Sequence, residues 1–165
     1  RFGLIEGRPV VVRLPEAVLR AFFGSPESLI ALTASGVVPA DVKSLVIRTE
    51  QGELRLVRDL DRWRAPDFST EVPAGTVNEL LEQLTSLQAA QIRIQEYPQD
   101  LQVATITMRG FDNRPIDTVR IAREKDTGRW ALENGDNVLR VFAKSLQLRL
   151  TPGDFGLQSP PPDTR

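Results

Sequence analysis

The side chains of this 165-residue chain that could perform chemistry are acidic pairs, one serine beside a lysine, two tryptophans and many arginines. Asp59 and Asp61 offer two carboxylates, which are the hard oxygen ligands that divalent cations prefer. No other ligand residue converges on them in the sequence, so a solvated turn is the favoured interpretation. Asp112-Asn113 and Asp136-Asn137 are interpreted as turn residues for the same reason.

Nucleophilic catalysis has little support in the sequence. The chain contains no histidine and no cysteine, which removes the commonest general base, the commonest metal ligand and the thiolate nucleophile. Lys144 and Ser145 are adjacent, and adjacent positions on a helix do not face each other. We therefore expect a non-catalytic protein with no cofactor and no metal.

Arginine is unusually frequent, since lysine accounts for only Lys43, Lys125 and Lys144 among 21 basic residues. Arginine is enriched at protein interfaces and binds carboxylates through two parallel hydrogen bonds. The alternative, which we favour, is cross-strand ion pairing with nearby acidic residues. The residues of the candidate interaction surface are Arg48, Arg55, Arg58, Trp63, Arg120, Arg123 and Trp130.

Trp63 and Trp130 have two interpretations. Each closes an amphipathic strand pattern, where a core aromatic residue is expected, and this interpretation is favoured. Alternatively, both rings stack on a sugar or small ligand beside the neighbouring arginines. The second interpretation leaves open a carbohydrate- or small-ligand-binding module.

Composition narrows the class of protein further. Hydrophobic residues make up 41% of the chain and charged residues 26%, as in ordinary globular proteins. The net charge of -1 argues against nucleic acid as a partner, because binding to its phosphates needs an excess of cations. No apolar run is long enough to span a membrane. The chain begins within a strand-like pattern, and we expect any membrane anchor to lie outside it.

Hydrophobic periodicity predicts mainly strands. A hairpin is expected over Phe2–Leu14, followed by a short helix over Glu16–Phe23. Val77, Leu80, Leu81, Leu84 and Leu87 recur at helical spacing, with Thr76 as the expected N-cap and Glu79 completing a capping box. Ala143–Leu150 is predicted to be another short helix. The remaining expected strands cover 42–49, 53–58, the segment ending at Trp63, 91–95, 103–109, 118–124, 129–133 and 138–142.

These elements predict an α+β fold of two similar layered units, each a mostly antiparallel sheet covered by short helices. The expected divisions are 1–40, which completes a repeat, 41–97, 98–157 and a flexible tail over 158–165. Two sequence echoes suggest an internal duplication: LRLVRDLDRW ending at Trp63 resembles VRIAREKDTGRW ending at Trp130, and residues 3–11 resemble residues 131–139.

The stretch from Val10 to about Phe155 resembles a bacterial family, the domain of unknown function 4340. The motif Pro-Ala-Asp-Val at 39–42 leads into a strand, and a pattern of Leu56, Arg58 and Trp63 follows. The resemblance continues through the helix and the next strand, at Val77, Leu80, Leu81, Leu84, Ala90 and Ile92.

The resemblance implies an extracytoplasmic domain, on the periplasmic side of the membrane, in a protein anchored by a segment outside this chain. It also implies an auxiliary role in an ABC-type transport or gliding-type apparatus. The expected partners are therefore membrane subunits of a transporter. The resemblance carries over no catalytic residue, and it says nothing about oligomeric state.

Overall fold

The computed structural model of the chain describes residues 2–4, 11–13, 15–18, 30–68 and 70–157. It divides the chain into two units, residues 1–31 and 32–165. In the first unit, β1 (Phe2–Leu4) pairs antiparallel with β2 (Val11–Arg13). This confirms the two strands of the expected hairpin. Its turn, and most of the helix expected over 16–23, lie outside the described residues.

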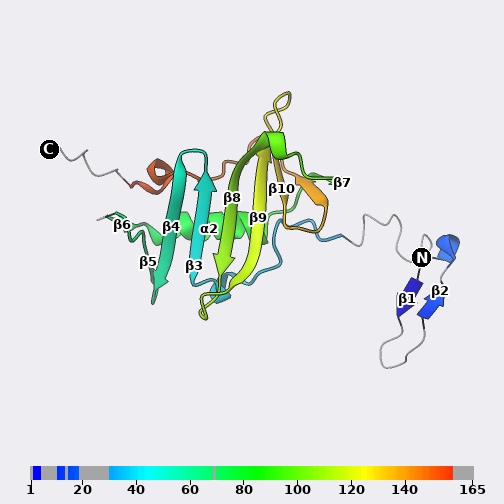
Figure 1. The fold of residues 1–165 in the computed structure, drawn as a ribbon, viewed down its shortest axis with the longest axis horizontal. Helices are drawn as coiled ribbons and strands as arrows, with labels where there is room; N and C mark the ends of the chain where they lie inside the picture. The colour runs from blue at the N-terminus through cyan, green and yellow to red at the C-terminus, as the bar shows by residue number, and fades with distance from the viewer. Residues whose placement is uncertain (1, 5–10, 14, 19–29, 69, 158–165) are drawn as a thin grey trace. The chain divides into compact units, whose positions relative to one another are not determined.

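The second unit contains one sheet of nine strands, in the order β6-β5-β4-β3-β8-β9-β10-β11-β7, with every pairing antiparallel (Figure 1). Two meanders meet at the β3–β8 pair and run outward in opposite directions. The strands are β3 (Ser44–Thr49), β4 (Gly52–Asp59), β5 (Arg62–Arg64), β6 (Glu71–Val72), β7 (Gln91–Ile94), β8 (Gln102–Arg109), β9 (Pro115–Arg123), β10 (Trp130–Glu133) and β11 (Val138–Val141).

This sheet corrects the expected arrangement of two separately layered units. Residues 41–97 and 98–157 both supply strands to the same sheet, which is continuous across β3 and β8. The first meander is followed by a helix that carries the chain to the far edge, where β7 pairs with β11. Sequence periodicity gave the sheet-rich character correctly, but it contained no information on which strands pair across the middle.

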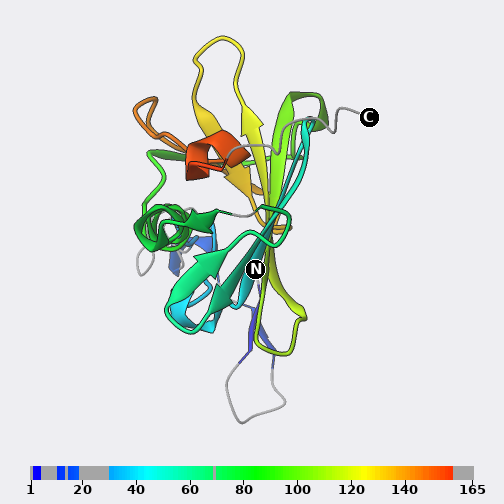
Figure 2. The same ribbon diagram turned by 90° about the vertical axis from the view of Figure 1, so that its left-hand side faces the viewer.

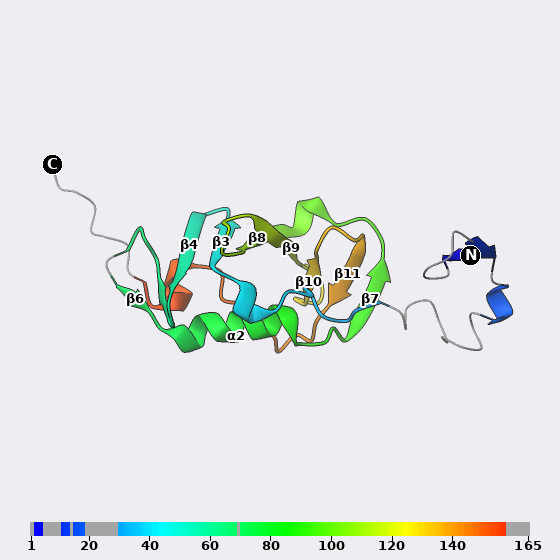
Figure 3. The same ribbon diagram turned by 90° about the horizontal axis from the view of Figure 1, so that it is seen from below.

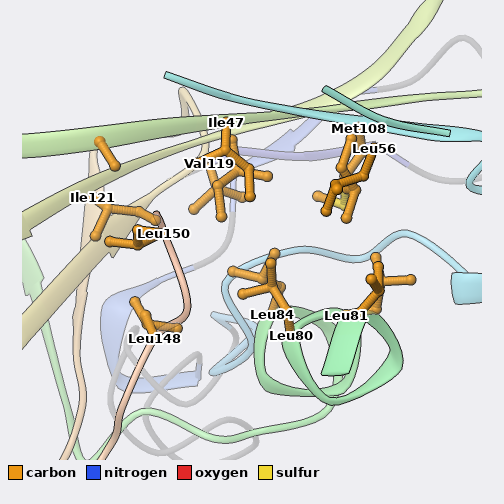
Figure 4. Close-up of a cluster of buried hydrophobic side chains, with 14 of the residues drawn as sticks. Ile47, Leu56, Leu80, Leu81, Leu84, Met108, Val119, Ile121, Leu148 and Leu150 are labelled. Atoms are coloured by element: carbon orange, nitrogen blue, oxygen red, sulfur yellow. The ribbon is translucent and has the colours of Figure 1, made fainter. Parts of the chain in front are cut away.

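The helix that makes this crossing is α2 (Ala74–Thr85), which runs along one face of the sheet (Figure 3). Val77, Leu80, Leu81 and Leu84 are buried, as their spacing predicts. Figure 4 shows Leu80, Leu81 and Leu84 directed toward the sheet residues Ile47, Leu56, Met108 and Val119.

Both predicted ends of this helix are wrong. The helix begins at Ala74, with Pro73 as its N-cap at φ −58° and ψ 119°, which is a non-helical conformation as an N-cap requires. The N–H of Thr76 already donates to the Pro73 carbonyl at 3.0 Å, so Thr76 lies within the first turn and cannot cap it. The helix ends at Thr85, which leaves Leu87 outside the apolar stripe and 41% exposed.

The segment from 143 to 157, called here the strap, returns across the same face of the sheet as α2 (Figure 2). The helix predicted over Ala143–Leu150 is absent: these residues are not helical. Leu146, Leu148 and Leu150 are buried at every second position, which is the period of an extended chain and not of a helix. The strap ends in the 3-10 helix η4 (Pro152–Phe155), whose Phe155 is buried.

Asp154 fixes the start of η4 and gives a prediction on acid stability. Its Oδ2 accepts hydrogen bonds from the N–H groups of Leu150 and Thr151, at 3.0 and 2.8 Å, and from the Thr151 hydroxyl at 2.8 Å. Burial raises the pKa of Asp154, but these hydrogen bonds outweigh it and hold the pKa below the usual range. A lowered pKa means that this carboxylate stabilises the fold above about pH 4, and that its contribution is lost as the pH falls through the folded-state pKa.

We therefore expect Asp154→Asn to lower the free energy of unfolding by about 1 kcal/mol at pH 7, as for loss of a helix cap. The difference between variant and parent should shrink below pH 4. Urea denaturation at pH 7 and pH 3 checks this, with Asp126→Asn in the exposed β9–β10 turn as the control. A difference that grows in acid would contradict the assignment.

Candidate interaction surface

One face of the nine-stranded sheet is covered by α2 and the strap, and no other described element of this unit covers the central part of the opposite face (Figure 2). We call this opposite face the outer face. Its residues alternate along the strands with the core residues Leu45, Ile47, Leu54, Leu56 and Ile106. Its central residues are Val46, Arg48, Glu53, Arg55, Thr105, Thr107, Arg109 and Thr118.

The structure separates the candidate surface residues onto the two faces of the sheet. Arg48, Arg55 and Arg120 lie on the outer face, because they alternate with core residues of β3, β4 and β9. The other four residues form two pairs on the face covered by α2 and the strap. Arg58 stacks on Trp63 with 5.0 Å from guanidinium carbon to ring centre, and Arg123 stacks on Trp130 at the same distance.

The two tryptophans are core residues, as the favoured interpretation holds. Trp63 is 1% exposed and packs in the main hydrophobic cluster. Trp130 is partly buried against the same cluster, and its indole N–H donates to the Leu146 carbonyl at 2.9 Å. A sugar cannot reach the face of Trp63 while the core remains packed.

Most arginines of the outer face have a carboxylate partner on a neighbouring strand or turn, as cross-strand pairing predicts. The pairs are Arg48–Glu53 at 2.7 Å, Arg64–Asp59 at 2.7 Å, Arg62–Glu71 at 3.4 Å, Arg93–Glu124 at 2.6 Å and Arg120–Glu133 at 2.5 Å. The hydrogen bond from the Thr127 hydroxyl lowers the pKa of Glu124; burial opposes this effect, and Arg93 adds to it.

Arg55 and Arg109 differ from these arginines, because neither pairs with a carboxylate of the described residues. Within the described residues, Arg55 forms no ion pair or side-chain hydrogen bond. Arg109 donates to the backbone carbonyl of Asn113 at 2.9 Å and has no carboxylate partner in the part of the chain that the structure describes. Together with Arg48, these arginines surround a hollow of about 220 Å³, lined by Val46, Arg48, Glu53, Arg55, Arg109 and Asn113. We call it the arginine hollow.

Sequence reasoning missed Arg109 as a surface residue. It ends the strand QVATITMR, and its alternation with Ala104, Ile106 and Met108 was the available signal for its face. Its closeness to Arg48 and Arg55 depends on the pairing of β3 with β8, in which Ser44 lies opposite Arg109. That pairing joins residues about 60 positions apart, and local pattern does not reveal it.

A second group of polar side chains lies where the loop after β7 crosses the outer face. Arg120 stacks on Tyr97, 4.7 Å from its ring centre, and pairs with the fully buried Glu133. Burial raises the pKa of Tyr97, although the nearby Arg120 lowers it and Glu133 adds to the increase. Glu133 also accepts the N–H groups of Gly135 at 2.7 Å and Asn137 at 3.1 Å, so this cluster holds the β10–β11 turn in place.

The acidic pairs behave as turn residues. Asp59 is paired with Arg64, and Asn113 and Asn137 adopt positive φ of 63° and 58°, as asparagine in turns often does. Asp136 forms two hydrogen bonds to Arg140; despite the opposing effect of burial, these and the N–H of Val138 lower its pKa. Among the described residues there is no group of three acidic, histidine or cysteine side chains placed to hold a metal ion.

A larger groove, of about 580 Å³, lies between α2 and the strap. Amide side chains from both walls line it, namely Gln83 and Gln88 from the helix side and Gln147 from the strap. The Oε1 atom of Gln83 is buried and has no hydrogen-bond partner among the described residues. Ser145 also lines the groove, whereas Lys144 does not, so the two side chains are not brought together for nucleophilic chemistry.

None of the helices in the described segments is both long enough and apolar enough to cross a membrane. No protein-family model matches the sequence, and neither a curated protein nor a solved structure matches the chain.

Proposed function

We propose that this chain is a non-catalytic interaction domain on the extracytoplasmic side of a membrane-anchored protein. Its role is auxiliary to an ABC-type transport or gliding-type apparatus, as the sequence resemblance implies. The observation that carries the proposal is the outer face. It is the centre of a nine-stranded sheet that no other described element covers, and two of its arginines, Arg55 and Arg109, have no carboxylate partner among the described residues.

The chemistry of this face suits a protein partner. Val46 lies at its centre and is almost covered by its neighbours, while Thr105, Thr107 and Thr118 supply short side chains with hydroxyl groups. Arginine is enriched in protein interfaces, where its flat guanidinium group both packs and donates several hydrogen bonds. A sheet surface that is held rigid by a helix on its other face needs little rearrangement to bind.

The experiment is crosslinking of the full-length tagged protein in its native cell, followed by identification of the captured proteins. Recovery of transporter membrane subunits, reduced by Arg55→Glu and unchanged by Lys125→Glu, supports the proposal. Capture of no such subunit by a correctly localised, folded protein overturns it. The proposal would also be overturned if the full-length protein had neither a membrane anchor nor an export signal.

The groove between α2 and the strap favours a second candidate function, which is the binding of a carbohydrate or other small polar ligand. Amide groups from Gln83, Gln88 and Gln147 can donate and accept hydrogen bonds at once, as a hydroxyl-rich ligand requires. The unpartnered oxygen of Gln83 supplies an acceptor at its wall.

Trp130 provides a test of the second candidate, because its indole N–H is bonded to the carbonyl of Leu146, a residue that lines the groove. We expect a soluble cell-wall glycan fragment that binds there to shift the tryptophan fluorescence, and Gln147→Ala to weaken the response. Gln51→Ala, in the exposed β3–β4 turn, is the control. An unchanged spectrum across a panel of glycan fragments would remove this candidate.

We also infer that the two meanders arose from an internal duplication. Arg58 lies directly opposite Trp63 on neighbouring strands, and Arg123 lies directly opposite Trp130 in the second meander. Both pairs stack at the same distance. This correspondence of strand pairing supports the duplication that the two similar segments suggest.

A further inference from the structure

We propose that the arginine hollow binds carboxylate side chains on an acidic segment of a partner protein. This inference rests on the proposed function and deepens it, because it gives the chemistry by which the partner is recognised. The site consists of Arg48, Arg55 and Arg109 around Val46, with Glu53 and Asn113 completing its wall.

The hollow carries an excess of positive charge. Three guanidinium groups and one carboxylate line it, which leaves two positive charges in excess. Glu53 is engaged by Arg48 at 2.7 Å, so the excess resides on Arg55 and Arg109. Toward β5 and β6, the outer-face arginines Arg62 and Arg64 are matched by carboxylates, and Arg120 is matched by Glu133 on the other side. The uncompensated charge is thus concentrated at the centre of the face.

The exposure of the lining side chains also suits a carboxylate ligand. Val46 lines the hollow but is only 7% exposed, while the side chains of Arg48 and Arg55 are exposed to solvent. A hollow bounded by guanidinium groups fits a side chain that ends in a carboxylate, as glutamate does. Guanidinium groups are well suited to this terminus, because they form two parallel hydrogen bonds with it.

The surroundings favour a protein segment over a long polyanion. Within the hollow, only Arg55 and Arg109 lack a carboxylate partner among the described residues. The arginines on either side are already paired with carboxylates, so an evenly charged nucleic acid would meet no net positive charge beyond the hollow. A short acidic segment would place one or two carboxylates in the hollow. Its backbone would then lie over Thr107 and Thr118, whose hydroxyl groups are 3.4 Å apart.

The test is a titration of the folded 165-residue chain with a fluorescently labelled hexaglutamate peptide, followed by anisotropy at low and at physiological salt. We expect saturable binding that weakens with salt, as for a partly exposed ionic contact. The double variant Arg55→Gln/Arg109→Gln should weaken binding by about tenfold or more, because it removes the two uncompensated guanidinium groups. The control Lys125→Gln/Lys144→Gln changes the net charge equally at two exposed sites away from the hollow.

Equal loss in the two double variants would show binding to net charge alone and would overturn the proposal, as would absence of binding to the parent. Inorganic phosphate and single-stranded oligonucleotide serve as competitors. Displacement of the peptide only by acidic peptide supports the proposal, whereas stronger displacement by phosphate or oligonucleotide at equal charge assigns the site to phosphate ligands and overturns it. Capture of transporter subunits without peptide binding would leave the proposed function intact and refute this inference alone.

Discussion

Leu84→Ala is expected to lower the free energy of unfolding by about 2–5 kcal/mol, the range for truncating a buried leucine. Leu84 is fully buried on α2 and lies between the helix and the sheet (Figure 4). Its backbone carbonyl also accepts the N–H of Ser35 at 2.8 Å, so the neighbouring chain has little freedom to collapse into the cavity. Urea denaturation followed by circular dichroism measures the change.

Glu82→Ala is the matched control, because Glu82 lies two residues away on the exposed side of the same helix. Glutamate and alanine have similar helix propensities, so we expect a change within about 0.5 kcal/mol. Equal losses from the two variants would mean that the apolar stripe of α2 does not face the sheet.

The elements whose sequence pattern is local and regular were predictable. The buried stripe of α2 follows from helical spacing, and β3 and β4 follow from alternation on either side of Glu50-Gln51-Gly52. Gly52 adopts a φ of +135°, a conformation that side chains rarely allow, which is why the turn could be located from sequence. The order of nine strands was not predictable, because the β3–β8 pairing joins two distant segments without any marker in either.

The strap was predicted to contain a helix, although its leucine spacing is that of an extended chain. The segment AKSLQLRL contains good helix formers, which favoured a helix. Its leucines nevertheless recur every second residue, and a helix would direct Leu146 and Leu148 to different sides. The extended form buries all three leucines against the core, so tertiary burial prevails over local propensity.

The candidate site was predictable only in part. The strand positions of Arg48 and Arg55 were evident. Alternation also puts Arg58 in phase with Leu54 and Leu56, and Arg123 in phase with Ile121, but the sequence prediction grouped both with the other arginines, and their stacking on the tryptophans appeared only in the structure. The sequence also could not show which arginines are neutralised. That distinction depends on strand register, which places Glu53 opposite Arg48 and leaves Val46 opposite Arg55.

Strand register also places Glu133 opposite Arg120, where the two form a buried ion pair, and Glu133→Gln tests the contribution of this pair to stability. The Glu133 side chain is fully buried. Its Oε2 accepts a hydrogen bond from the Nε–H of Arg120 at 2.7 Å and forms an ion pair with Nη2 of the same guanidinium at 2.5 Å. Removing its charge leaves a guanidinium group that is 34% exposed and stacked on Tyr97 without its counter-ion. We expect a loss of about 3 kcal/mol, the lower end of the range for breaking a buried ion pair, because Arg120 keeps some contact with water.

Glu53→Gln provides the comparison, since it breaks a pair of similar length, Arg48–Glu53, whose side chains are 66% and 49% exposed. Its expected cost is about 0–1 kcal/mol, because water already screens that pair. Chemical denaturation of both variants at pH 7 gives the two values. A cost for Glu53→Gln that equals or exceeds the cost for Glu133→Gln would mean that Glu133 is not buried against Arg120. The ordering we expect would show that the outer face contains two kinds of arginine: Arg120, which stabilises the fold, and Arg55 and Arg109, which are left available to a partner.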